Sequence, residues 1–276
     1  MTTLPIAALA AGATAATATT AYLSARLSLE HDLLFLNIFG STALNLVRAV
    51  RQDRVSVFYV LEKHATTNLT SANRPFLRFE GREHTYAQTY DTVLRYGHWL
   101  STVHGVGKGD VVALDFTNSD QFVFLWFALW AIGATPAFIN HHLTGAPLVH
   151  SLKSSTAKLA LVDPRVESGL TGEVRSELAG TRFVVVTEEV EREAISCDAV
   201  RYPDEVRKVD RYVGLAILIY TSGTTGLPKP AIMSWGKIYV AAMMAAKGAR
   251  LTKDDVVYLV SSETRKIRPG STGWRR

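Results

Sequence analysis

The chain has 276 residues, of which 47% are hydrophobic, so it can form one large domain or two small ones with a sizeable core. Its single cysteine, Cys197, excludes an internal disulfide and favours a reducing compartment. The net charge of +5 does not indicate a nucleic-acid partner, because residues 261–276 alone carry +4 and the other 260 residues only +1. This tail has one acidic residue, Glu263, against Arg265, Lys266, Arg268, Arg275 and Arg276.

Residues 1–50 are predicted to be membrane-associated leader helices. Residues 1–25 carry no charged side chain and match the roughly 20 residues of a bilayer span, although Ala and Thr make them only weakly hydrophobic. A second apolar stretch, Leu33 to Leu46, precedes Arg48, Arg51 and Arg54. These cations could face anionic lipid from an interfacial helix. The alternative is a disordered leader followed by an ordinary surface helix.

Residues 44–133 are predicted to contain two helices, a hairpin and then a strand-helix pair. Leu44 to Lys63 is predicted to be mostly helical, and residues 74–86 to form a hairpin that turns at Glu80-Gly81. Thr85 and Gln88 form a capping box for a helix that reaches about Val103. A strand over 111–116 then precedes a very apolar helix over 122–132, which is too short to span a membrane and is expected to pack against a sheet.

From residue 135 onward, predicted strands alternate with helices. The strands are expected at 135–139, 159–162, 183–186, 215–220, 231–235 and 256–260. The helices are expected at 144–154, 164–178 and 238–247, and residues 188–212 are expected to be irregular. This alternation predicts an α/β fold with a mainly parallel sheet flanked by helices. Ligands of such sheets bind beyond the carboxyl ends of the strands.

A loop rich in glycine and hydroxyl groups follows the apolar strand 215–220. It reads Thr221-Ser222-Gly223-Thr224-Thr225-Gly226-Leu227-Pro228-Lys229. The glycines allow close backbone approach, successive N–H groups can form an anion-binding nest, and Lys229 adds a mobile cation. The loop therefore predicts a polyphosphate site. It is not a Walker A motif, because two residues separate Gly226 from Lys229.

Two other groups of residues are weaker candidates for a site. The pair His141-His142 is not expected to bind a metal, because adjacent residues of an extended segment point in opposite directions and no carboxylate or cysteine lies at ligand spacing. No metal ligand is therefore predicted. Asp254-Asp255 is expected to be a solvated turn.

Several stretches resemble the fatty acid transport protein family, the very-long-chain acyl-CoA synthetases among the adenylate-forming enzymes. The loop 221–229 is similar to their phosphate-loop signature, and residues 227–232 to that of the fungal branch. Residues 79–82, 105–114, 121–133 and 138–145 add to a likeness that covers about residues 30–258. The resemblance implies an adenylate-forming fold, of which residues 51–260 form part of the N-terminal domain.

The resemblance also implies an activity, which is the ATP-dependent conversion of a fatty acid to acyl-CoA through acyl-AMP, and a coupling of this activity to fatty acid uptake. It implies ATP, Mg²⁺ and coenzyme A as cofactors, and a cytosol-facing position on a membrane. The residues that it assigns to the β- and γ-phosphates are Thr221, Ser222, Gly223, Thr224, Thr225, Gly226 and Lys229.

After Tyr258 the chain departs from the family pattern and becomes basic and polar. Residues 261–276 are therefore expected to be an aberrant tail. The family's magnesium-binding glutamate, ribose-binding aspartate and mobile C-terminal domain have no counterpart here, so no complete catalytic set is predicted and the chain is expected to be truncated and inactive alone. The alternative function is a non-catalytic, membrane-associated lipid- or nucleotide-binding pseudoenzyme.

Overall fold

A six-stranded sheet forms the centre of the computed structural model, which describes residues 6–209, 212–221 and 227–258. The strand order is β6-β5-β3-β4-β7-β8, and only β8 runs antiparallel to its neighbour. The strands are β3 (Val111–Asp115), β4 (Thr135–Ile139), β5 (Leu159–Val162), β6 (Arg182–Val185), β7 (Leu215–Thr221) and β8 (Lys229–Ser234). The predicted α/β fold with a mainly parallel sheet is confirmed.

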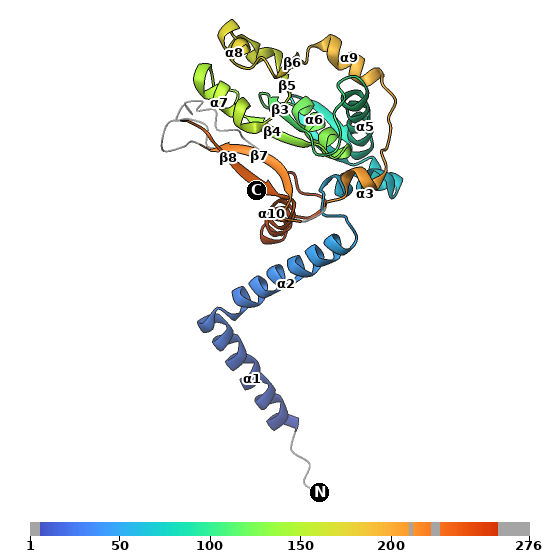
Figure 1. The fold of residues 1–276 in the computed structure, drawn as a ribbon. Coiled ribbons are helices and arrows are strands. Elements are labelled where there is room, and N and C mark those ends of the chain that lie inside the picture. Colours follow the sequence, from blue (N-terminus) through green and yellow to red (C-terminus); the bar gives the residue numbers. More distant parts are fainter. Residues whose placement is uncertain (1–5, 210–211, 222–226, 259–276) are drawn as a thin grey trace, which may run out of the picture.

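Helices cover both faces of this sheet (Figure 1). On one face lie α5 (Tyr86–Thr102) and α6 (Asp120–Ala131), and on the other lie α7 (Gly145–Ser155) and α8 (Gly172–Glu177). The two faces arise because alternate residues of a strand point in opposite directions. In β3, Leu114 packs in the cluster that contains Leu125 of α6, whereas Ala113 packs in the cluster that contains Leu148 of α7.

The predicted hairpin and capping box are both present. Strands β1 (Pro75–Phe79) and β2 (Arg82–Thr85) join through Glu80 and Gly81, whose φ angles of 46° and 80° are typical of a two-residue hairpin turn. At the start of α5, the Thr85 hydroxyl accepts a hydrogen bond from the Gln88 amide (3.2 Å), and the Gln88 side chain accepts one from the Thr85 amide (2.9 Å).

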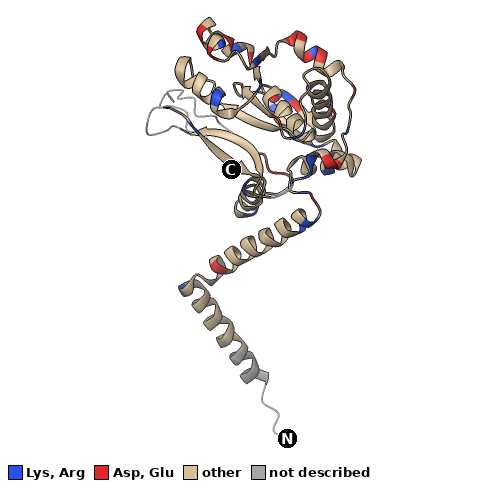
Figure 2. Cartoon of the chain, viewed as in Figure 1, with Lys and Arg blue, Asp and Glu red and all other residues tan. Residues whose placement is uncertain are grey.

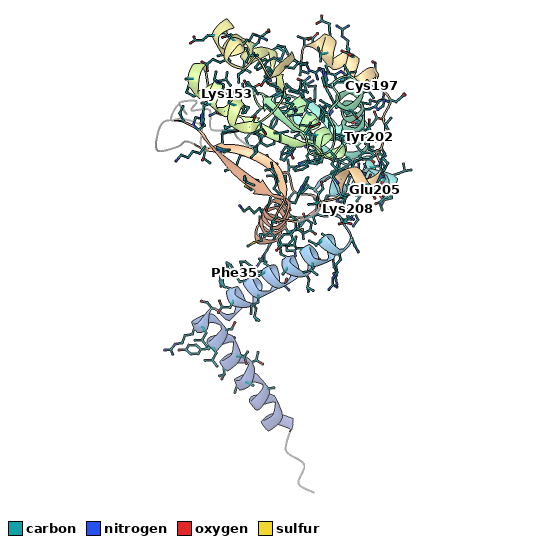
Figure 3. All side chains as sticks on the ribbon, in the orientation of Figure 1. Phe35, Lys153, Cys197, Tyr202, Glu205 and Lys208 are labelled. Atoms are coloured by element: carbon teal, nitrogen blue, oxygen red, sulfur yellow. The ribbon has the colours of Figure 1, made fainter. Side chains whose placement is uncertain are left out.

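Two long helices project from the globular part (Figure 1). They are α1 (Ile6–Leu27) and α2 (Leu29–Arg51), and Phe35 lies on the projecting part of α2 (Figure 3). Within the described residues, the segment His31–Arg51 is the one stretch long and apolar enough to cross a membrane. The carboxyl half of α2 packs against α10 (Trp235–Gly248), where Lys247 Nζ donates to Ser41 Oγ at 2.6 Å.

Leu44 to Lys63 is mostly helical, as predicted, with an interruption at residues 52–57, where Asp53 adopts a φ of 52° that a right-handed helix does not allow. The helices α3 (Phe58–Thr66) and α4 (Leu69–Ala72) follow. Three other predictions were wrong. The helix expected over 164–178 is a 3₁₀ turn, η1 (Pro164–Gly169), followed by α8, because two glycines weaken the join and Thr171 caps a new helix.

The segment 188–212 is not irregular throughout. It contains α9 (Glu188–Ser196) and the 3₁₀ turn η2 (Asp204–Arg207). The high charge of α9 suggested an irregular segment. Two features nevertheless favour a helix: Thr187 caps it, and its first turn is acidic, which the helix dipole stabilises. Residues 256–258 form no strand and are exposed, since no described strand lies beside them, and residues 259–260 lie outside the described part.

Candidate functional site

The predicted phosphate loop lies at the carboxyl end of β7. Thr221 ends β7, Lys229 begins β8, and the two residues pair in the antiparallel ladder. The Thr221 hydroxyl also donates to the Lys229 carbonyl oxygen at 3.4 Å. The other assigned residues, Ser222, Gly223, Thr224, Thr225 and Gly226, lie outside the described residues, so their role stays a prediction.

The two ends of the loop present polar groups to solvent. Thr221 and Lys229 are both exposed, and directly opposed residues of an antiparallel pair point to the same face of the sheet. The Lys229 ammonium has no hydrogen-bond or ion-pair partner in the described part of the chain. An exposed cation without a described partner therefore lies at the mouth of the loop, on the same face as Thr221, and this cation suits an anionic ligand.

Tyr220, the residue before the loop, is anchored to α7. Its hydroxyl donates to the Ser151 carbonyl oxygen at 2.8 Å and accepts from Ser154 Oγ at 3.3 Å. Burial raises the pKa of the Tyr220 phenol, so it stays a neutral donor at physiological pH. The end of β7 is thus held against α7 while Thr221, the next residue, turns to the opposite face.

Asp115, the last residue of β3, carries a buried carboxyl group. It pairs in register with Ile139 of β4 and Val162 of β5, its residue is 3% exposed, and its Oδ1 has no hydrogen-bond partner among the described residues. Burial, and secondly the negative charge of Asp163, raises the pKa of Asp115 to about 7. Sequence analysis missed this residue, although a carboxylate that directly follows the apolar run Val111–Leu114 was the available signal.

Asp163, which follows β5, is fully engaged in a local network. Its Oδ2 accepts from Thr117 Oγ1 at 2.6 Å and from Arg165 Nη2 at 2.8 Å, and its Oδ1 accepts from the Arg165 amide at 2.9 Å. Burial alone would raise the pKa of Asp163, but these hydrogen bonds outweigh it and the pKa is lowered. The network joins the segment after β3 to the start of η1.

The described residues do not offer a fitting site for a magnesium ion. No group of three or more His, Cys, Asp or Glu side chains comes together in the described ranges, and Asp163 is committed to Arg165. We therefore assign no metal ligand. The expectation that His141 and His142 point in opposite directions was wrong: they lie in a turn, and their ring centroids are 4.0 Å apart.

The chain is similar in sequence to AMP-binding enzymes and to fungal fatty acid transport proteins. Residues 62–262 match the family model of the AMP-binding enzyme. The very long-chain fatty acid transport protein of Saccharomyces cerevisiae is 34% identical over 83% of this chain, and that of Cochliobolus heterostrophus is 32% identical over 90%. The chain spans only 36% and 39% of the length of these two relatives.

A solved structure shares the fold. The o-succinylbenzoate CoA synthetase of Bacillus subtilis, in complex with an acyl-adenylate intermediate, superposes with a TM-score of 0.58 at 24% identity. The superposition covers 71% of this chain and 37% of that protein.

Proposed function

The chain belongs to the family of AMP-binding enzymes, and from this premise we propose that it is the nucleotide-binding part of a fatty acid–CoA ligase. In this reaction a long- or very-long-chain carboxylate attacks the α-phosphorus of ATP, forming acyl-AMP and releasing pyrophosphate. The thiol of coenzyme A then attacks the acyl carbon and releases AMP. The names of the two fungal relatives support a fatty acid substrate, and the acyl-adenylate bound to the structural neighbour supports the intermediate.

The loop at the carboxyl end of β7 is proposed to bind the β- and γ-phosphates. The observation that carries this role is the pairing of Thr221 with Lys229, which closes the loop and places a hydroxyl and a cation on one exposed face. Donors and a cation that face the departing pyrophosphate stabilise its developing charge. Ser222 to Gly226 are proposed to add amide and hydroxyl donors. Mg²⁺, when bound, would neutralise further phosphate charge, and no residue is assigned to it here.

We propose three segments for the chain, namely membrane-associated leader helices at 1–50, AMP-binding residues at 51–260 and a separate basic tail at 261–276. Support for the first comes from α2, on which seven large apolar side chains are exposed: Leu33, Phe35, Leu36, Phe39, Leu44, Val47 and Val50. Figure 2 shows few charged residues along α1 and α2, with basic ones at the carboxyl end of α2. Such helices fit a membrane surface on the cytosolic side.

Titration calorimetry with ATP tests the loop. We expect Lys229→Gln to weaken ATP affinity, and Lys158→Gln, which removes an exposed lysine far from the loop, to leave it unchanged. Equal ATP affinity of the wild type and Lys229→Gln would show that Lys229 does not bind the phosphates.

Release of pyrophosphate from ATP, measured with and without a long-chain fatty acid, tests whether this chain catalyses the first step by itself. Release that depends on the fatty acid supports the ligase and contradicts the expectation that the chain is inactive alone. ATP binding without such release is expected both of the nucleotide-binding part of a ligase and of a non-catalytic lipid- or nucleotide-binding protein.

A further inference from the structure

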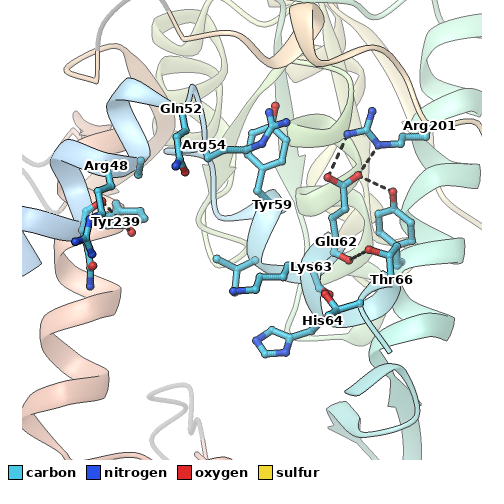
Figure 4. Close-up of a pocket in the computed structure, with 15 residues that line it drawn as sticks. Arg48, Gln52, Arg54, Tyr59, Glu62, Lys63, His64, Thr66, Arg201 and Tyr239 are labelled. Carbon is cyan, nitrogen blue, oxygen red and sulfur yellow. Dashed lines mark hydrogen bonds and ion pairs between the residues drawn. The ribbon is translucent and has the colours of Figure 1, made fainter. Parts of the chain in front are cut away.

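A cavity of about 780 Å³ lies where α2, α3, α5 and α10 meet (Figure 4). Its walls include Arg48 of α2, Lys63 of α3, Tyr90 of α5 and Tyr239 of α10. The volume is within the usual range of roughly 300–1,000 Å³ for a small-molecule site. Figure 1 places this junction at the opposite end of β7 from the phosphate loop, so the cavity is separate from the proposed nucleotide site.

The charges that line the cavity are mostly positive. Four of the lining residues are cations, Arg48, Arg54, Lys63 and Arg201, and Glu62 is the one acidic residue in the lining. Glu62 is already neutralised, because it accepts hydrogen bonds from Arg201 Nε at 2.6 Å and from the Tyr90 hydroxyl at 2.8 Å. Burial alone would raise the pKa of Glu62, but these bonds lower it, so the carboxylate stays ionised and bound.

Two of the four cations have no side-chain partner among the described residues. Arg54 pairs with Asp204 at 2.6 Å, and Arg201 pairs with Glu62 and Asp204. Arg48 and Lys63, by contrast, have no side-chain hydrogen bond or ion pair with any described residue. They line the cavity from two different helices, α2 and α3 (Figure 4). A cavity with two unpaired cations and a satisfied carboxylate is complementary to an anion.

The cavity reaches the edge of the exposed apolar side of α2 at Arg48, which lies one turn beyond the exposed Leu44. Thr42 and Ala49 are buried against the globular part, whereas Leu33, Leu36, Leu44 and Val47 are exposed. At 3.6 residues per turn, these four side chains lie on the face opposite Thr42 and Ala49. Because one face of α2 packs on α10, the helix fits a position along a membrane surface rather than across it. Arg48 lies to the side of the helix, between these two faces, and this is the level of the lipid headgroups for a helix in the membrane plane.

We propose that this cavity binds the phosphate-bearing headgroup of an anionic membrane phospholipid, held between Arg48 and Lys63. The phosphate accepts charge-assisted hydrogen bonds from both side chains. The acyl chains lie in the membrane beside the exposed face of α2. This inference rests on the membrane association proposed above for residues 1–50, and it adds a specific lipid site at the junction with the globular part.

Vesicle flotation of the full 276-residue chain tests the site. One set of vesicles contains phosphatidylcholine alone, and the other contains phosphatidylcholine with phosphatidylinositol. Arg48→Gln is compared with Arg51→Gln, which removes an exposed cation of the same helix end that does not line the cavity. Lys63→Gln is compared with Lys158→Gln. Circular dichroism confirms that each variant remains folded.

We expect phosphatidylinositol to increase vesicle binding of the wild type. Arg48→Gln and Lys63→Gln should each reduce this increase at least about tenfold, as expected for loss of a hydrogen bond to a charged group. Arg51→Gln should reduce it about fivefold or less, as one diffuse surface charge does, and Lys158→Gln should have no effect. All variants should bind phosphatidylcholine vesicles equally.

Three results would overturn the site. The first is an equal effect of Arg48→Gln and Arg51→Gln, which would indicate general surface charge. The second is an equal effect of Lys63→Gln and Lys158→Gln. The third is binding of soluble glycerophosphoinositol without any gain from the lipid, which would indicate a soluble ligand. Failure of the wild type to bind any vesicle would instead refute the membrane association proposed for residues 1–50. None of these variants is expected to lose ATP binding.

Discussion

Thr221 and Lys229 face each other across the β7–β8 pair, with the Thr221 hydroxyl donating to the Lys229 carbonyl oxygen at 3.4 Å. This pairing orients the Lys229 side chain through its backbone, because the strand ladder fixes both residues on one face of the sheet. The ammonium itself stays exposed and free of described partners. The ammonium can therefore attract a phosphate group, but solvent screens this electrostatic attraction.

Lys229→Gln should weaken ATP binding mainly at low salt. An exposed charge pair is worth roughly 0–1 kcal/mol and is screened at high ionic strength, so the loss should be about fivefold or less and should shrink as salt is added. Calorimetric titration of the wild type and Lys229→Gln over a series of salt concentrations measures this. A loss of affinity that does not change with salt would show that Lys229 is desolvated in the complex.

Asp115→Asn should stabilise the protein at alkaline pH. The pKa of Asp115 is raised from 3.8 to about 7 in the folded state. Its ionisation therefore lowers the free energy of unfolding as pH rises from about 4 to about 7, by up to about 4 kcal/mol, with no further change above that range. Asparagine cannot ionise, so the variant should lose this part of the pH dependence.

Urea denaturation at several pH values measures the effect of Asp115→Asn, with the exposed Asp198→Asn as the control. The two proteins should have similar stability at about pH 4, and Asp115→Asn should be more stable at about pH 8. Parallel stability curves for the wild type and Asp115→Asn would show that Asp115 titrates normally.

Gly133→Ala should strongly destabilise the fold. Gly133 has a φ of 78°, and a Cβ atom there would clash with the Val206 carbonyl oxygen. Backbone strain and this clash together should cost at least about 3 kcal/mol. Gly107→Ala is the control, because it has open space for a Cβ atom and no positive φ. Thermal unfolding of both variants measures the difference, and similar melting temperatures would contradict the prediction.

Arg207→Met should destabilise the join between η2 and the core. Arg207 is 3% exposed, and its guanidinium donates to the Ala131 carbonyl oxygen at 2.7 Å and to Asp204 Oδ1 at 2.8 Å. Methionine keeps most of the packing but leaves a buried carbonyl oxygen without its donor, so we expect a loss of about 3–5 kcal/mol. Arg192→Met, at an exposed position, should change the free energy of unfolding by less than about 0.5 kcal/mol in the same denaturation experiment.

Tyr220→Phe should loosen the base of the phosphate loop. The substitution keeps the ring but removes the hydrogen bond to the Ser151 carbonyl oxygen, which is worth about 1 kcal/mol. Hydrogen exchange of the amides in β7 and α7 should become faster, while that of β5 should not change. Unchanged exchange in β7 would show that the tyrosine ring alone holds this end of the strand.

The sequence by itself determined the local elements of this protein. The capping residue Thr85, the Glu80-Gly81 turn and the apolar strand runs each act through groups only a few residues apart, so their patterns could be recognised directly. The phosphate loop was recognised in the same way, as a short run of glycines and hydroxyl groups after a strand. The charged helix α9 was missed because its cap at Thr187 lay in a segment whose composition suggested a loop.

Only the tertiary structure decided which of these elements lie together. The order of strands places β3 between β4 and β5, and this buries Asp115 among apolar neighbours and within the electrostatic influence of Asp163. The basic cavity likewise brings Arg201 beside Lys63, although the two residues come from distant parts of the chain. Such contacts depend on how whole sheets and helices pack, and no local propensity or spacing encodes the distance between residues that far apart.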